Sequence, residues 1–75
     1  MTFTGAQVRA ARTLLGWPHH RVAGEIAISL SEFASFEAGK SWLSRVQTSV
    51  LNRVLTAAGV EFEDDGRVRM GEGGP

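Results

Sequence analysis

Apolar residues recur at a spacing of three to four positions in three stretches of this 75-residue chain. Residues at that spacing share one side of an α-helix, so each stretch predicts helix with a buried face. The first and last stretches cover about residues 5–15 and 45–58. Their apolar positions are Val8, Ala11, Leu14 and Leu15 in the first, and Val50, Leu51, Val54, Leu55 and Ala58 in the last.

The middle stretch predicts two short helices, about residues 18–26 and 30–38, joined by a tight turn. Their apolar positions face each other and form the predicted core: Val22, Ala23, Ile26, Ile28, Phe33 and Phe36. Ala23 is expected where the two helices cross, because a close crossing needs a small side chain. Gly39 is expected to end the second helix, since glycine adopts positive φ at little cost.

Three residue pairs have the spacing of a capping box: Thr4 with Gln7, Ser29 with Glu32, and Ser44 with Gln47. In this box the hydroxyl accepts from the amide three residues on, and the partner side chain accepts from the amide of the capping residue. Each pair therefore predicts the start of a helix. Gly16 is expected to end the first helix, and Pro18 to begin the second.

After Gly59 the apolar spacing changes from helical to alternating, at Val60, Phe62, Val68 and Met70. An Asp65-Gly66 pair lies between the two alternating segments and predicts a β-hairpin over residues 60–70. An isolated two-stranded hairpin is marginally stable, so it is expected either to pack on the last helix or to pair with a second copy.

The predicted fold is all-α, with four to five short helices in residues 1–59, followed by a short C-terminal β-hairpin. Residues 71–75 are rich in glycine and are expected to be disordered. A chain of this length buries only about 60% of its unfolded surface, so a second copy would add useful stability.

Together these residues resemble the lambda-repressor-like helix-turn-helix family, also called Xre, and its small single-domain bacterial members in particular. The resemblance rests on GAQVRAARTLLGW (residues 5–17), the six predicted core residues of the two middle helices, EAG (37–39) and LTAAGVEF (55–62). The chain departs from the family pattern at Ala27, usually glycine, and His19, usually glutamine, and its recognition helix lacks basic residues. The resemblance implies a DNA-binding transcription regulator, a repressor that acts as a homodimer on an operator.

In a helix-turn-helix the second helix of the pair enters the major groove of double-stranded DNA. The resemblance and the helical spacing place four residues on its outward side as base contacts: Ser29, Leu30, Ser31 and Ser35. Serine can donate to or accept from a base edge and leucine can contact a thymine methyl, but neither forms a bidentate pair with guanine. The expected selectivity is weak, and the same pattern also fits solvated surface or a protein contact.

Five further residues are expected to contact DNA phosphates: His19, His20, Arg21, Lys40 and Arg45. The first three lie in the first turn of a predicted helix, where free amides and the helix dipole favour an anion. The alternative is a solvated helix start with a histidine against Trp17. No metal site or other cofactor is expected, because adjacent histidines point in different directions and the chain has no cysteine.

A homodimer interface is expected at the hairpin and at an aromatic residue in the loop before the last helix: Trp42, Phe62, Val68 and Met70. Exposed strand edges can pair between copies with little added core. Trp42 is expected either at this interface or packed on the last helix. Trp17 matches the end of the family's first helix and is expected in the core.

The formal net charge is zero but is unevenly distributed. Residues 1–60 hold six Lys and Arg against three Glu, a formal charge of +3, and residues 61–75 hold two Arg against five acidic residues, a charge of −3. The helical part is therefore mildly basic. Neutrality overall favours an alternative function, in which the scaffold binds another protein as an antirepressor, antiactivator or antitoxin-like partner.

The composition also favours a soluble, cytoplasmic protein. The chain has no cysteine for disulfides, no apolar run near the roughly 20 residues that span a bilayer, and no signal-peptide pattern. An enzyme is not expected, since the sequence shows no nucleophile–base arrangement, no metal-ligand spacing and no phosphate-binding loop.

Overall fold

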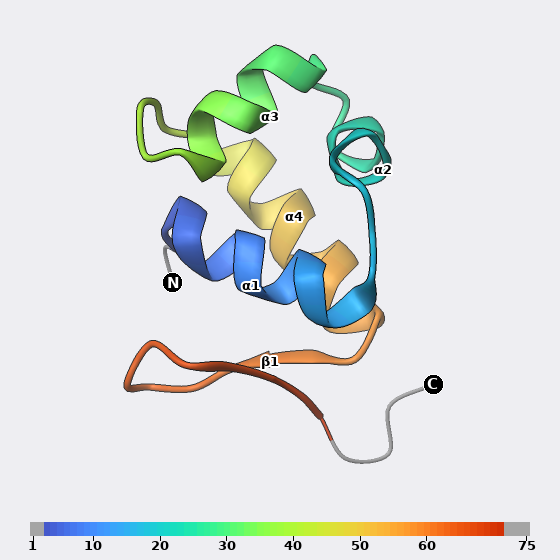
Figure 1. Cartoon of the computed structure of the whole chain (residues 1–75), viewed down its shortest axis with the longest axis vertical. Coiled ribbons are helices and arrows are strands. Elements are labelled where there is room, and N and C mark those ends of the chain that lie inside the picture. The colour runs from blue at the N-terminus through green and yellow to red at the C-terminus, as the bar shows by residue number, and fades with distance from the viewer. Residues whose placement is uncertain (1–2, 72–75) are drawn as a thin grey trace.

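The computed structural model describes residues 3–71, and within that range four α-helices precede a two-stranded antiparallel hairpin. The elements are α1 (Gly5–Leu15), α2 (His19–Glu25), α3 (Leu30–Glu37), α4 (Arg45–Ala57), β1 (Val60–Phe62) and β2 (Val68–Met70). The hairpin lies under α1, whereas α3 lies at the opposite end of the molecule (Figure 1). The predicted fold class is confirmed. The tail predicted to be disordered covers residues 71–75, of which residues 72–75 lie outside the described range.

One hydrophobic core joins the four helices and β1. Its buried residues are Phe3, Val8, Ala11, Val22, Ala23, Ile26, Phe33, Phe36, Leu51, Leu55 and Val60. Ile28 and Trp17 are partly buried against this core. Leu14, predicted on the inner face of α1, is 49% exposed, and that part of the prediction is wrong. The buried positions of α1 are Gly5, Val8 and Ala11, and in the last turn Leu15 packs against the core in place of Leu14.

The helix starts follow the predicted caps closely. Complete capping boxes form at α1, with Thr4 and Gln7, and at α4, with Ser44 and Gln47. At α3 only half of the box forms: the Glu32 amide donates to the Ser29 hydroxyl (3.0 Å), and that hydroxyl in turn lies 3.3 Å from the Glu32 carboxylate. Pro18 caps α2 from outside the helix instead of forming its first residue. Gly16 and Gly39 have positive φ, as predicted for residues that end helices.

The connection between α2 and α3 consists of residues 26–29. Ala23 is only 3% exposed, and the Ile28 amide donates to its carbonyl (3.1 Å), so the chain reverses tightly around a small side chain. Ala27 has φ 57°, the one positive φ among the non-glycine residues described. A side chain in this left-handed region costs about 1–2 kcal/mol. A glycine at this turn position would avoid that cost.

The hairpin packs on helices of its own chain. Val60 is buried, and Phe62 and Val68, a cross-strand pair, are partly buried against the core. The Phe3 and Phe62 rings lie 4.7 Å apart, and the Gln7 side chain donates to the Gly66 carbonyl (3.0 Å). Packing within the chain, one of the two predicted alternatives, is therefore observed, and it involves α1 as well as α4.

The hairpin turn is held by a local side-chain contact. The Asp65 carboxylate accepts from the Arg67 amide (3.0 Å) and from the Arg67 guanidinium (2.7 Å), and Gly66 has φ 91°. These two bonds hold the pKa of Asp65 below its usual value. The predicted Asp-Gly turn is thus confirmed.

In the part of the chain described, no helix has both the length and the apolarity needed to cross a membrane.

We expect Ala27→Gly to stabilise the fold by about 0.5–1 kcal/mol, because relief of the strained φ exceeds the added entropy of the unfolded chain. Gly24→Ala, three residues earlier inside α2, should stabilise by a similar amount, because alanine loses less backbone entropy than glycine when a helix forms. The added Cβ would meet no atom within 4 Å. Urea denaturation of both variants checks this. A loss of stability in Ala27→Gly would contradict the role assigned to the turn.

Gly5→Ala is expected to destabilise the fold by at least about 2 kcal/mol. A Cβ at Gly5 would lie 2.0 Å from the Phe36 carbonyl oxygen, so the start of α1 and the end of α3 would have to move apart. Gly24→Ala is the matched control, since it adds the same methyl group in open space. Equal melting temperatures for Gly5→Ala and the unmodified chain would show that this close approach is absent in solution.

Candidate nucleic-acid interface

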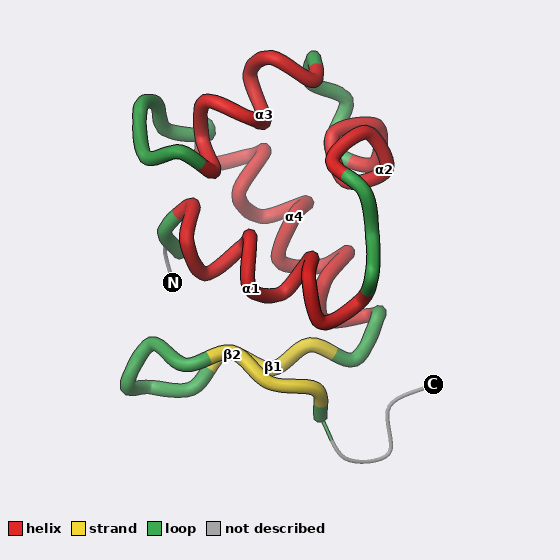
Figure 2. Tube along the Cα trace, viewed as in Figure 1, coloured by secondary structure: helices red, strands yellow, loops and turns green. Residues whose placement is uncertain are grey.

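The outward side of α3 is open to solvent at the end of the molecule far from the hairpin (Figure 2). Leu30 is 52% exposed, Ser31 and Ala34 are exposed, and Ser35 is partly buried. Phe33 and Phe36 on the inner side fix the rotation of the helix, and both are buried. Ala34 was missing from the predicted base contacts, although it lies three residues after Ser31 and thus on the same side.

Ser29 differs from the other predicted base contacts because its hydroxyl is already engaged. It accepts from the Glu32 amide and donates toward the Glu32 carboxylate, as described above. This contact also keeps the Glu32 carboxylate close to the start of α3. The side chains that are free to meet a ligand on this surface are therefore short and uncharged: Leu30, Ser31 and Ala34, with Ser35 at the edge.

A buried carboxylate connects α1, α2 and α3 beside this surface. The Glu37 side chain is 4% exposed and accepts from Arg12 Nε (2.9 Å) and Nη2 (3.3 Å), and His19 Nε2 lies 3.2 Å from its Oε1. Arg12 Nη1 also donates to the Trp17 carbonyl (3.0 Å). Within residues 3–71 no buried side-chain nitrogen or oxygen lacks a partner, so the buried oxygens of Glu37 are satisfied. We call these residues, Arg12, His19 and Glu37, the Glu37 brace.

Two of the predicted phosphate contacts, His19 and Arg21, already contact other side chains of the protein. His19 reaches toward Glu37 and lies edge-on to the Phe33 ring, with 5.9 Å between centroids, although it stays half exposed. Arg21 lies over the Trp17 ring, 4.2 Å from its centroid. The predicted alternative placed a histidine against this ring. Both side chains are thus held by the protein itself. His20 is exposed and has no such contact in the described residues.

Lys40 and Arg45 are the predicted phosphate contacts with the greatest freedom. Both are exposed, and neither forms an ion pair within residues 3–71. Lys40 follows α3 directly, and its amide donates to the Ser35 carbonyl (2.9 Å), which fixes where the loop leaves the helix. Arg45 is the first residue of α4. Their charges are therefore available at the C-terminal end of α3.

The four residues predicted for a homodimer interface do not form one surface. Trp42, in the loop after α3, is 79% exposed, so the alternative in which it packs on the last helix is wrong. Phe62 and Val68 pack inward against the core, because the hairpin buries its apolar face on its own helices. Met70 is 39% exposed on the hairpin, at the other end of the molecule from the Trp42 loop (Figure 1).

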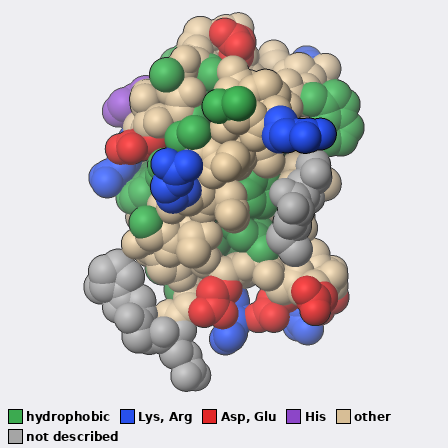
Figure 3. Space-filling model, turned by 180° about the vertical axis from the view of Figure 1, so that it is seen from behind, with side chains coloured by type: hydrophobic (Ala, Val, Ile, Leu, Met, Phe, Trp, Pro, Cys, Tyr) green, Lys and Arg blue, Asp and Glu red, His purple; other side chains and the backbone are tan. Residues whose placement is uncertain are grey.

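Among residues 3–71 no three His, Asp or Glu side chains are grouped as metal ligands. Most of the acidic side chains visible from behind the molecule gather on the hairpin, where basic side chains lie among them, and further basic side chains lie on the helical part above it (Figure 3). The uneven charge seen in the sequence is thus also an uneven charge in space.

Comparison with known proteins places this chain in no family: no family model, no curated protein and no solved structure matches it.

We expect Glu37→Gln to destabilise the fold by about 2–4 kcal/mol, because it leaves the Arg12 guanidinium, 14% exposed, without a charge partner. Arg12→Leu should cost a similar amount, and the double variant should cost less than the sum. The control is Arg69→Ala on the hairpin, which removes the exposed pairs with Glu61 and Glu63 and should change stability by less than about 1 kcal/mol. Additive effects of the two brace variants in urea denaturation would refute the coupling.

Proposed function

We propose that this chain is a DNA-binding transcription regulator of the lambda-repressor-like type, a repressor that acts as a homodimer on an operator. The arrangement of α2 and α3 supports the proposal most strongly. Two short helices pack through Ala23 around a four-residue turn, and the second presents an open side at the end of the molecule. Such a helix enters the major groove with its first residues at the base edges.

In this proposal Lys40, Arg45 and His20 bind phosphates and position α3 without reading sequence. His19 and Arg21 contribute less, because the first is held by Glu37 and the second stacks on Trp17. The mildly basic helical part faces the DNA, and the acidic hairpin points away from it.

Base recognition in this proposal depends on shape and apolar contact. Leu30 and Ala34 can lie against thymine methyl groups, and Ser31 can exchange a hydrogen bond with either kind of base edge. The side chain of Glu32 is turned toward the Ser29 hydroxyl, which limits its repulsion of phosphate. We therefore expect a site rich in A·T pairs and modest discrimination between sites. In a homodimer the two copies of α3 would enter successive major grooves, about 34 Å apart.

A second candidate function uses the same scaffold to bind another protein. The observations that favour it are the uncharged outward side of α3 and the 79% exposure of Trp42. Exposed aromatic side chains are common at protein interfaces and rare elsewhere on a surface.

Selection from random DNA duplexes at about 50 and 150 mM salt separates the two functions, since phosphate contacts weaken steeply over that range. We expect enrichment of a defined site at the lower salt. Ser31→Ala should alter the preferred sequence, whereas Lys40→Ala should weaken binding to all sequences and reduce the salt slope by about 0.9, the value for one phosphate. Arg67→Ala, which removes the same charge from the hairpin loop, is the control. Failure to enrich any site at either salt would exclude specific DNA binding.

A further inference from the structure

The start of α4 carries an exposed group of apolar and basic side chains. Trp42 is 79% exposed and Val46 73%, and Lys40 and Arg45 flank them. A large aromatic residue left in water at such an extent is unusual in a small domain and marks a surface that another molecule covers. We call these four residues the Trp42 knob.

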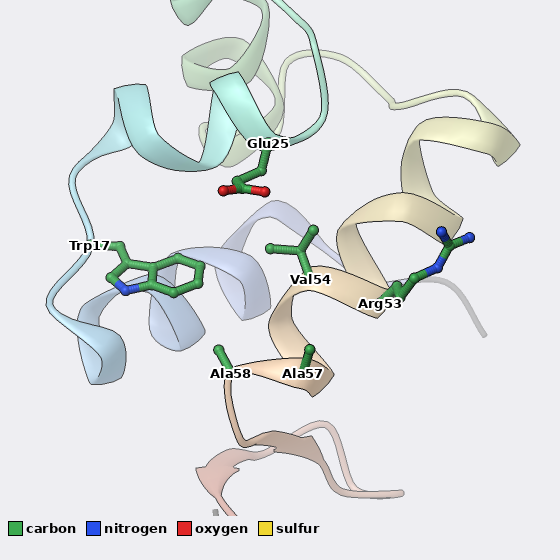
Figure 4. Close-up of a pocket in the computed structure, with 6 residues that line it drawn as sticks. All are labelled: Trp17, Glu25, Arg53, Val54, Ala57 and Ala58. Carbon is green, nitrogen blue, oxygen red and sulfur yellow. The ribbon is translucent and has the colours of Figure 1, made fainter. Parts of the chain in front are cut away.

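The other end of α4 carries a complementary hollow. A pocket of about 380 Å³ opens between α2 and the last turns of α4, lined by Trp17, Glu25, Arg53, Val54, Ala57 and Ala58. The Trp17 ring points into it, the Glu25 carboxylate hangs over it from α2, and the Arg53 side chain points away (Figure 4). The pocket floor is aliphatic and aromatic, so it suits an apolar ring and not a charged one.

The knob cannot fill the pocket of its own chain. Trp42 precedes α4 and the pocket lies at the C-terminal end of that helix, and a 13-residue helix is about 20 Å long. A second copy can do so. When two copies place their α4 helices antiparallel across a twofold axis, the start of each helix lies beside the end of the other.

We propose that two copies of this chain associate through antiparallel α4 helices, with Trp42 of each copy in the α2–α4 pocket of the other. One indole ring then stacks near Trp17 and covers Val54 and Ala58. Between the two knobs the exposed surface of α4 is formed by Ser49, Asn52, Arg53, Thr56 and Ala57. All but Arg53 are short, so the helices can approach closely on either side of it.

Charge favours the same partner. Glu25 forms no ion pair within residues 3–71, and the same holds for Lys40 and Arg45. Association brings Arg45 of the knob to the Glu25 carboxylate at the rim of the pocket. Arg53, the other charged residue of the pocket, points away from it (Figure 4). The knob and the pocket therefore match in polarity, and Arg45 meets the opposite charge of Glu25, while Lys40 and His20 stay available for phosphate contacts.

Sedimentation equilibrium of the full chain, without DNA, tests the proposal. An interface of this kind is small, below about 1,200 Å², so we expect a reversible dimer with dissociation between about 10 µM and 1 mM. Trp42→Ala should weaken association at least about tenfold, since truncation of a buried interface Trp has this effect. Its fold should be unchanged by circular dichroism, because the side chain is exposed in the single chain. Leu14→Ala, which truncates an exposed apolar residue of α1, is the control and should leave association unchanged.

A charge exchange tests the pairing itself. Glu25→Lys and Arg45→Glu should each weaken association, and the double variant should restore it, because the opposite charges then meet with their signs reversed. A chain that stays monomeric up to about 1 mM would overturn the proposal. Association that Trp42→Ala leaves unchanged would also overturn it, and so would a mass that keeps rising beyond that of two copies, because a twofold contact closes at the dimer.

Discussion

The orientation of α3 depends on one buried carboxylate. Glu37 sits in the last turn of α3, and through Arg12 and His19 it joins that turn to α1 and to the start of α2. A buried charge is costly unless it is paired and hydrogen-bonded, and here two donors of Arg12 satisfy it, with His19 Nε2 3.2 Å away. The apolar core fixes how deeply α3 packs, through Phe33 and Phe36, but apolar contacts have little directionality. The brace adds the directional contacts that hold the outward side of α3 in one place.

The backbone supports the same contact. Gly5 lets the start of α1 approach the Phe36 carbonyl so closely that no side chain would fit, and the short approach keeps Arg12 within reach of Glu37. Ala27 stores strain at the turn before α3, and the core and the brace together hold it there. These contacts thus hold α3 in position, and α3 is the element with the most open surface at its end of the molecule.

Much of this fold could be predicted from the sequence, because most of it depends on local patterns. The spacing of Val8, Ala11, Leu51 and Leu55 predicted α1 and α4, the S/T-x-x-Q pairs predicted where these helices start, and Asp65-Gly66 predicted the hairpin turn. Contacts between distant residues could not be predicted in this way. The ion pair of Arg12 with Glu37 is one of them, since nothing near Arg12 in the sequence reveals the carboxylate that holds it. The inward packing of Phe62 and the exposure of Trp42 likewise depend on which surfaces the folded chain leaves uncovered. The sequence also could not reveal that several candidate interface side chains are held by other residues: Ser29 by Glu32, Arg21 by Trp17 and His19 by Glu37.

The most direct measurement is a titration of the ¹⁵N-labelled chain with duplex DNA at about 50 mM salt, followed by amide chemical shifts, because even non-specific binding is strong enough to detect there. If α3 is the DNA-contacting helix, the amides of Leu30–Ala34, His20 and Lys40 should shift, the shifts should diminish at higher salt, and the hairpin amides of residues 60–70 should stay in place. Shifts confined to the hairpin, or no shifts at all at low salt, would contradict the assignment of α3 as a DNA-reading helix.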